Sequence, residues 1–265
     1  MPQIAPEPPS LRIPDLAGKR ILITGASTGI GAELAEAFSE QGARVAIHYA
    51  HSEDAAYEVA GAIGRKGGKP HVVQGDLAKC PECERVVEEA VAALGGLDGL
   101  INNAGLMLGR VPTTQATTEH FDEVMALNAR SVFSVSRAAV PHLKAAGGGF
   151  IIHTTSVAAR NGGGGGAVLY AAAKGFVSTF TKGQAKELIG ERIRVNAVAP
   201  GVIETPFHAR YSTPEQMEAM RATIPIGRVG RPEDCVGAYL FLASEALSGY
   251  MIGQVLEVNG GQLMP

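Results

Sequence analysis

The stretch Thr24-Gly25-Ala26-Ser27-Thr28-Gly29-Ile30-Gly31 decides how this chain folds. It follows an apolar run at 20–24, which is typical of a buried strand, and precedes a stretch with helical periodicity at 31–41. Such a turn points backbone N–H groups and the positive end of a helix dipole at a bound phosphate. Glycine is needed because a side chain would block the approach of a pyrophosphate. Tight packing alone is the alternative, but the position after the first strand favours cofactor binding.

The rest of the chain alternates between strand-like and helix-like patterns. Further apolar runs predict strands at 44–49, 71–74, 97–102, 149–155, 192–198 and 254–258. Helical patterns occur at 53–65, 81–94, 118–145, 169–188 and 232–243. The alternation predicts one Rossmann-type α/β domain over residues 16–265, a doubly wound seven-stranded parallel sheet with helices on both faces. Five prolines in the first 14 residues predict a flexible N-terminal arm over residues 1–15.

Composition excludes several classes of function. The formal net charge of the 265 residues is -3, and the basic residues are scattered, so nucleic acid is not an expected partner. No apolar stretch reaches the roughly 20 residues of a membrane span, and no leader is visible, so we expect a cytoplasmic protein with no membrane partner. Three cysteines agree with a reducing compartment. Cys80 and Cys83 have the spacing of a metal or redox pair but lack further ligands, so no metal is predicted.

The residues after the second strand bear on the choice of cofactor. This is where the adenosine ribose of a dinucleotide lands, and the chain there reads His48-Tyr49-Ala50-His51-Ser52. This segment contains no carboxylate that would repel a 2′-phosphate, and its His51 and Ser52 can donate hydrogen bonds to such a phosphate. NADP is therefore the expected cofactor. NAD is the alternative cofactor, because no Arg or Lys stands beside His51 and Ser52 to bind a 2′-phosphate. These two residues can also belong to a solvated loop that binds no cofactor.

Two more strand ends offer cofactor contacts. Asp76-Leu77 follows the third strand and can reach the adenine, although an aspartate there can instead cap the next helix. The segment Asn102-Asn103-Ala104-Gly105 closes the fourth strand. Its small residues let the backbone lie against a flat cofactor, whereas its amides can instead tie neighbouring strands together.

A second group of residues is suited to proton transfer. Tyr170 and Lys174 are four residues apart in a helical pattern, so their side chains share one face. A phenol titrates near pH 10, so forming the phenolate at neutral pH costs roughly 4 kcal/mol. We expect the Lys174 ammonium to lower that pKa, which makes Tyr170 a general acid in reduction and a general base in oxidation. Ser156, at the end of the fifth strand, can hydrogen-bond the substrate oxygen.

These motifs together resemble the classical short-chain dehydrogenase/reductase family over residues 16–262. The matching segments are the turn at 24–31, the segment at 102–105, Ser156 with Tyr170-x-x-x-Lys174, and Pro200-Gly201-Val202-Ile203-Glu204-Thr205. The resemblance implies a hydride transfer between NADP(H) or NAD(H) and a carbonyl or secondary alcohol. It also implies a homotetramer and a substrate lid at 206–225. By resemblance, Tyr170 is the acid/base, Lys174 also binds the nicotinamide ribose, Ser156 positions the carbonyl, Asn128 holds a relay water, and Pro200, Gly201, Ile203 and Thr205 lie at the nicotinamide.

The substrate stays open at this stage. Ser156 and Tyr170 are fourteen residues apart, where the family usually has thirteen, and a run of five glycines, 162–166, lies between them. That run is compatible with a flexible pocket wall or with simple disorder. A 3-oxoacyl thioester, a ketone and a sugar are all compatible with the sequence. A catalytically silent dinucleotide-binding redox sensor or regulator is the alternative from a different functional class.

Overall fold

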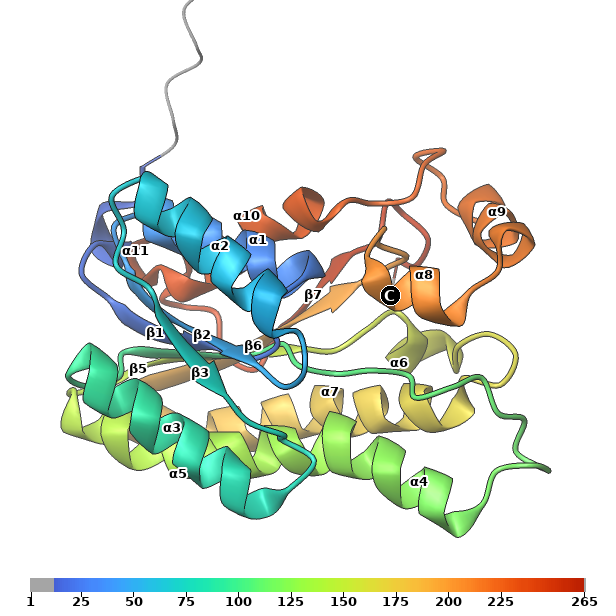
Figure 1. Cartoon of the computed structure of the whole chain (residues 1–265), viewed down its shortest axis with the longest axis horizontal. Helices are drawn as coiled ribbons and strands as arrows, with labels where there is room; N and C mark the ends of the chain where they lie inside the picture. Colours follow the sequence, from blue (N-terminus) through green and yellow to red (C-terminus); the bar gives the residue numbers. More distant parts are fainter. Residues whose placement is uncertain (1–11, 265) are drawn as a thin grey trace, which may run out of the picture.

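The computed structural model describes residues 12–264, and its centre is a parallel sheet of seven strands. The order across the sheet is β3-β2-β1-β4-β5-β6-β7 (Figure 1). The strands are β1 (Arg20–Ile23), β2 (Arg44–Tyr49), β3 (His71–Gln74), β4 (Gly99–Asn102), β5 (Gly149–Thr154), β6 (Ile193–Pro200) and β7 (Val255–Val258). All strand pairs are parallel, so the predicted doubly wound fold is confirmed.

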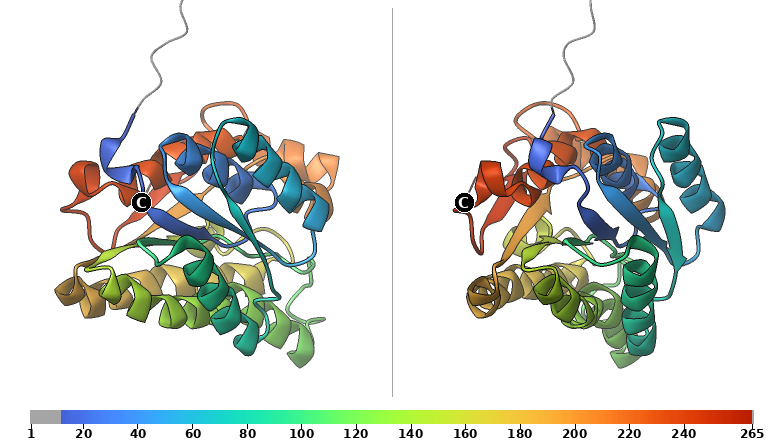
Figure 2. Two further views of the ribbon diagram at one scale, coloured as in Figure 1. Left: turned by 60° about the vertical axis from the view of Figure 1, so that its left-hand side comes forward. Right: turned by 90° about the vertical axis from the view of Figure 1, so that its left-hand side faces the viewer.

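Helices cover both faces of the sheet. The long ones are α1 (Gly29–Glu40), α2 (Glu53–Arg65), α3 (Cys80–Leu94), α4 (Thr118–Met125), α5 (Ser131–Ala145), α7 (Val168–Leu188), α9 (Pro214–Ala222) and α10 (Pro232–Ala243). The short ones are α6 (Ala158–Asn161), α8 (Pro206–Tyr211) and α11 (Glu245–Ser248). Helices α1, α2 and α10 lie on one face, and α3, α5 and α7 lie on the other (Figure 2). None of the helices within residues 12–264 combines the length and the hydrophobicity that a membrane span needs.

Two hydrophobic cores follow from this layering. One packs α1, α2 and α10 on the sheet around Phe38, Ile63 and Tyr239. The other packs α3, α5 and α7 around Val86, Leu143 and Ala185. Strands between two helical layers have no face toward water, which explains why they read in the sequence as continuous apolar runs.

The strand order opens a crevice for a ligand at the carboxyl ends of the central strands β1 and β4. The chain runs outward from β1 to β2 and β3, then returns to add β4 on the other side of β1. Connections therefore diverge above the carboxyl ends of β1 and β4, and a crevice opens there. Ile21 pairs with Val45 on one side and with Gly99 on the other, so the loops after β1, β2 and β4 emerge at the same edge.

The structure corrects or adds to the expectations in three places. The arm expected over residues 1–15 lies in part outside the described residues, whereas Ile13 is already buried and Pro14–Leu16 form a 3₁₀ turn. The helix expected at 118–145 is interrupted by a π-turn at Ala126–Arg130, so α4 and α5 are separate elements. The lid stretch is itself helical and forms α8 and α9.

Candidate active site

A cavity of about 890 Å³ opens at the carboxyl ends of β1, β2, β4, β5 and β6. It has the size of a site for a small-molecule ligand. Most of the residues predicted for the site line it: Gly25, Ser27, Thr28, Gly29, Ile30, Tyr49, His51, Ser52, Leu77, Ala104, Gly105, Ser156, Tyr170, Lys174, Pro200, Gly201, Ile203 and Thr205. Four predicted residues stand outside the lining, namely Gly31, Asp76, Asn102 and Asn128. The fold therefore brings the phosphate turn and the proton-transfer group into one cavity.

Glycine has distinct roles at two positions of the turn. Gly25 has a φ of +62°, and a Cβ there would lie 2.8 Å from the Cα of Ala104. Gly31 lies beneath the turn, where a Cβ would collide with the carbonyl oxygen of Gly25 and lie 2.6 Å from Nδ2 of Asn103. Gly31 thus lets α1 approach the turn, and it supports the site without lining it.

Asn103 is a site residue that the sequence reading did not single out. Its Nδ2 donates to the carbonyl oxygens of Gly25 at 2.9 Å and Thr24 at 3.1 Å. Its backbone N–H donates to the Thr24 hydroxyl at 3.0 Å. Asn103 therefore ties the end of β4 to the end of β1, which is the structural role predicted for the amides of this segment. Only an Asn-Asn pair after a buried strand signalled this role in the sequence.

His48 is another support of the turn. Its Nδ1 accepts the backbone N–H of Gly25 at 3.0 Å, and its Nε2 donates to the carbonyl oxygen of Gly75 at 2.9 Å. These partners require the neutral imidazole with the proton on Nε2. Burial lowers the pKa of His48 to about 4, in agreement with that form. His48 therefore holds the first glycine of the turn against the ends of β2 and β3.

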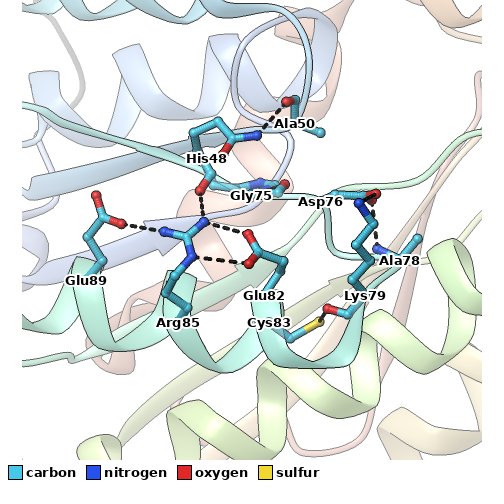
Figure 3. A network of polar contacts seen from close by, with 11 residues as sticks. His48, Ala50, Gly75, Asp76, Ala78, Lys79, Glu82, Cys83, Arg85 and Glu89 are labelled. Atoms are coloured by element: carbon cyan, nitrogen blue, oxygen red, sulfur yellow. Dashed lines mark hydrogen bonds and ion pairs between the residues drawn. The ribbon is translucent and has the colours of Figure 1, made fainter.

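Figure 3 shows a network of polar contacts at the ends of β2 and β3, beside the cavity. Arg85 pairs with Glu82 and donates to the carbonyl oxygen of Gln74, whose Nε2 donates to the carbonyl oxygen of Ala50 at 2.9 Å. Asp76 uses its carboxylate differently from the predicted adenine contact. Its Oδ1 accepts the N–H of Ala78 at 3.1 Å, and its Oδ2 lies 3.4 Å from Nζ of Lys79, so it stabilises the turn before α3.

The proton-transfer residues meet on the wall of the cavity. Tyr170 and Lys174 share one face of α7, with Nζ of Lys174 5.7 Å from the centroid of the Tyr170 ring. Nζ also donates to the carbonyl oxygen of Thr154 at 2.8 Å, which fixes the buried lysine at the end of β5. Ser156 lies just beyond that strand and lines the same cavity as Tyr170, close enough for its hydroxyl to act on the pKa of the phenol. The ring of Phe207, on α8, lies 5.5 Å from the Tyr170 ring between centroids.

Burial has the largest effect on the pKa values of Tyr170 and Lys174. It raises the pKa of Tyr170 to about 12, against a smaller opposing influence of the Ser156 hydroxyl. It lowers the pKa of Lys174 to about 8. The expected lowering of the Tyr170 pKa by Lys174 is therefore not seen in the protein by itself: burial sets the direction of the shift, and the opposing influence comes from Ser156. At neutral pH the pair consists of a phenol and an ammonium.

Asn128 supports this group from the π-turn. The amide is fully buried and pairs in both directions with Leu106, accepting its N–H at 3.1 Å and donating to its carbonyl oxygen at 2.8 Å. A Cβ on Gly105 would lie 2.7 Å from Oδ1 of Asn128 and 3.1 Å from Nζ of Lys174. The π-turn, the loop after β4 and Lys174 thus pack directly on one another.

Asn102 faces away from the cavity. Its Nδ2 donates to the Ser136 hydroxyl at 2.9 Å and to Nδ1 of His153 at 3.1 Å. Nε2 of that histidine then donates to Oε1 of Gln184 at 3.0 Å. The side chain ties β4 and β5 to α5 and α7, which is the structural alternative considered for the amides of this segment.

The glycine run forms part of the cavity wall. Gly163, Gly164 and Gly165 line the cavity, and the Gly166 carbonyl oxygen accepts the N–H of Val111 at 2.9 Å. A Cβ on Gly166, whose φ is +73°, would lie 2.7 Å from the carbonyl carbon of Arg110. Of the two interpretations of the run, the structure supports the pocket wall.

Comparison with known proteins gives consistent matches along the chain. The family model described as enoyl-(acyl carrier protein) reductase matches residues 25–262. Glucose 1-dehydrogenase of Gluconobacter oxydans is 36% identical over 247 residues, which cover 92% of each chain. The NADH-dependent reductase A1-R′, solved with NAD, superposes with a TM-score of 0.85 at 38% identity over 96% of this chain and 100% of its own.

A third match extends the range of relatives. A 7α-hydroxysteroid dehydrogenase, solved with NADH and 7-oxo glycochenodeoxycholic acid, superposes with a TM-score of 0.87 at 35% identity, covering 93% of this chain and 94% of its own. These relatives differ in what their names say they act on, whereas the fold and the length are shared. The cavity beside the glycine turn and the matches over nearly the whole chain show that the protein belongs to the short-chain dehydrogenase/reductase family of oxidoreductases.

Proposed function

We propose that the protein interconverts a carbonyl and a secondary alcohol, with Tyr170 as the general acid/base. The observation that carries this proposal is the convergence of Tyr170, Lys174 and Ser156 on the wall of the cavity that the glycine turn also lines. A nicotinamide cofactor bound along the turn at 25–30 would supply or accept the hydride. The protein's own residues would bind the substrate oxygen and move the proton.

The proton state of the site favours carbonyl reduction. Tyr170 is protonated at neutral pH and can donate its proton to the oxygen that gains charge. Ser156 would hold that oxygen by a hydrogen bond beside Tyr170. Oxidation instead requires the phenolate, and a pKa of about 12 sets its cost at roughly 7 kcal/mol at pH 7. Lys174, and a relay water at Asn128, would return the proton to Tyr170 after each turnover.

Replacing Tyr170 by Phe tests the proposal. The variant keeps the ring contact with Phe207 and loses only the hydroxyl, so we expect at least a thousandfold loss of kcat with little change in cofactor Kd. Turnover would be followed by nicotinamide absorbance with ketones, sugars and 3-oxoacyl thioesters, and binding by calorimetry. Undiminished turnover would disprove the role of Tyr170. Intact cofactor binding with no turnover by the wild-type protein on any substrate would favour a redox sensor.

We propose NADP(H) as the preferred cofactor, with NAD(H) also accepted. No carboxylate lines the adenosine end of the cavity, and His51 and Ser52 line it where a 2′-phosphate would lie. Two features limit the preference for NADP. No Lys or Arg lines that end, and Glu53 lies just outside the lining, where burial and the charge of its carboxylate raise the pKa of Tyr49. The ratio of kcat/KM for the two cofactors measures the preference.

We also propose a homotetramer located in the cytoplasm. Phe133 on α5 and Phe176 on α7 are 43% and 39% exposed, and both contact the ring of Phe180 at 6.3 and 5.4 Å between centroids. Such an aromatic surface is typical of a subunit interface. The three unpaired cysteines agree with a reducing compartment. Light scattering after size exclusion tests the assembly, and fractionation of cells tests the location.

A further inference from the structure

The cavity carries an excess of positive charge at the end away from the adenosine. No aspartate or glutamate lines it among the described residues. Its cations are Lys174, for which we propose a role in proton transfer, Arg110, which lies between the glycine run and the lid, and Arg210 on α8 of the lid. The chain as a whole has a net charge of -3, so the lining is opposite in sign to the protein average.

Arg110 is the residue that this charge distribution singles out. It lies on the loop after β4, is half-buried, and makes no ion pair with any residue in the described part of the chain. Burial lowers its pKa, which means that its charge is incompletely solvated in this position. An unpaired, partly desolvated guanidinium is costly unless a ligand compensates it.

The contacts of Arg110 leave part of its hydrogen-bonding capacity for a ligand. Nε donates to the carbonyl oxygen of Tyr211 at 2.6 Å, Nη1 to that of Gly165 at 3.2 Å, and Nη2 to the Ser212 hydroxyl at 3.3 Å. All three acceptors are neutral. A guanidinium has five N–H groups, so one N–H remains on each of Nη1 and Nη2.

The neighbours of Arg110 do not neutralise it. Burial, with a smaller contribution from the Arg110 charge, lowers the pKa of His208 to about 4, so this lining residue is neutral at physiological pH. Arg210 lies exposed on α8 and stacks on the Tyr211 ring at 5.5 Å. One half-buried cation with two remaining N–H groups matches the single charge and the two oxygens of a carboxylate.

We infer that the substrate bears a carboxylate, which Arg110 binds while the reacting carbonyl lies at Tyr170 and Ser156. The inference rests on the proposed hydride transfer and adds the class of its substrate, an oxo acid or hydroxy acid. Arg110 also connects the glycine run to α8 and Ser212, so an anion bound there would hold the lid and the wall together over the reacting centre.

Matched acids and esters test this inference. Levulinate and 5-oxohexanoate carry a ketone and a carboxylate, and their methyl esters differ mainly in charge. We expect the wild-type kcat/KM to favour each acid over its ester by about tenfold to a hundredfold at low salt, and less at high salt. Arg110→Gln should bring that ratio close to one, mainly through the KM of the acid, and Arg110→Lys should restore part of it. The control Arg65→Gln, on the exposed end of α2, should leave the ratio unchanged.

Three results are distinguishable from one another. Equal activity on acid and ester in the wild type overturns the carboxylate inference and leaves the hydride transfer intact. An equal loss of kcat/KM on acid and ester in Arg110→Gln also overturns it, because Arg110 would then only hold the glycine run against α8 without binding the carboxylate. Calorimetric titration of Tyr170→Phe, loaded with reduced cofactor, reports levulinate binding without turnover. Binding of the acid and not the ester there supports the inference even if the proposed chemistry fails.

Discussion

The ammonium of Lys174 lies 5.7 Å from the ring of Tyr170, one helical turn away on α7, and is anchored to the carbonyl oxygen of Thr154 at 2.8 Å. Because its hydrogen-bond partner is a neutral backbone group, burial lowers its pKa to about 8. The same burial raises the pKa of Tyr170 to about 12. The lysine is therefore the group whose charge changes first as the pH rises above neutrality.

This order of titration predicts the pH dependence of reduction. If the ammonium is the required form, kcat should be constant below about pH 8 and fall close to tenfold for each unit above it. Lys174→Arg, which stays charged throughout, should retain its residual activity to higher pH. Initial rates from pH 6 to 10 with saturating cofactor measure both profiles. A wild-type profile that stays level up to pH 9.5 would exclude the requirement for the ammonium.

The packing beneath the phosphate turn predicts a contrast between two glycines. Gly31→Ala would push a methyl group into the Gly25 carbonyl oxygen and the Asn103 amide, so we expect cofactor affinity to fall by at least about tenfold. Gly64→Ala, on α2 with no atom within 4 Å of the added Cβ, should be neutral or stabilise by about 0.5–1 kcal/mol. Fluorescence titration with reduced cofactor and urea denaturation compare the two variants. Normal affinity in Gly31→Ala would contradict the packing role.

Two buried histidines predict a loss of stability in acid. His48 and His153 have pKa values of about 4 in the fold and about 6.5 when unfolded, because burial disfavours the charged ring. The unfolded chain therefore binds more protons between those values. Stability should be constant above about pH 6.5 and fall toward pH 4, by on the order of 3 kcal/mol for each histidine. Urea denaturation between pH 7 and 4.5 measures the fall, and His153→Gln should reduce the slope by about one proton.

The carboxylate beside Tyr49 predicts a shift in cofactor preference. Glu53→Gln removes a negative charge from the adenosine end, and we expect the kcat/KM ratio of NADP to NAD to rise about threefold at low salt. Glu58→Gln, also exposed on α2, is the matched control and should leave the ratio unchanged. An equal change for both cofactors would place the effect in the fold of α2 and not in recognition of the 2′-phosphate.

Much of the site could be predicted because its features are local. The run at 20–24 followed by the glycine turn predicts a strand, a phosphate site and a helix within a few residues, and the spacing of Tyr170 and Lys174 places them on one helical face. The predicted parallel sheet then brings both groups to the same edge. Short-range geometry and the alternation of strands and helices are sufficient for these inferences.

Other features depend on contacts between distant segments. His48 and Asn103 support the turn through bonds to residues 23 and 78 or 79 positions away, and the only local sign of either role is the Asn-Asn pair after β4. Asn102 and Asp76 occupy positions that suit cofactor contact, yet packing directs the first into the core and the second to its own turn.

The sequence by itself determined the sheet, the glycine turn after β1 and the shared face of Tyr170 and Lys174 on α7, because backbone periodicity and residue spacing encode them within a few turns of chain. Only the tertiary structure decided the pKa order of Tyr170 and Lys174 and the position of Arg110 between the glycine run and the lid. Desolvation and side-chain direction depend on everything packed around a group, and the segments around Arg110 lie 55 to 102 residues away in the chain.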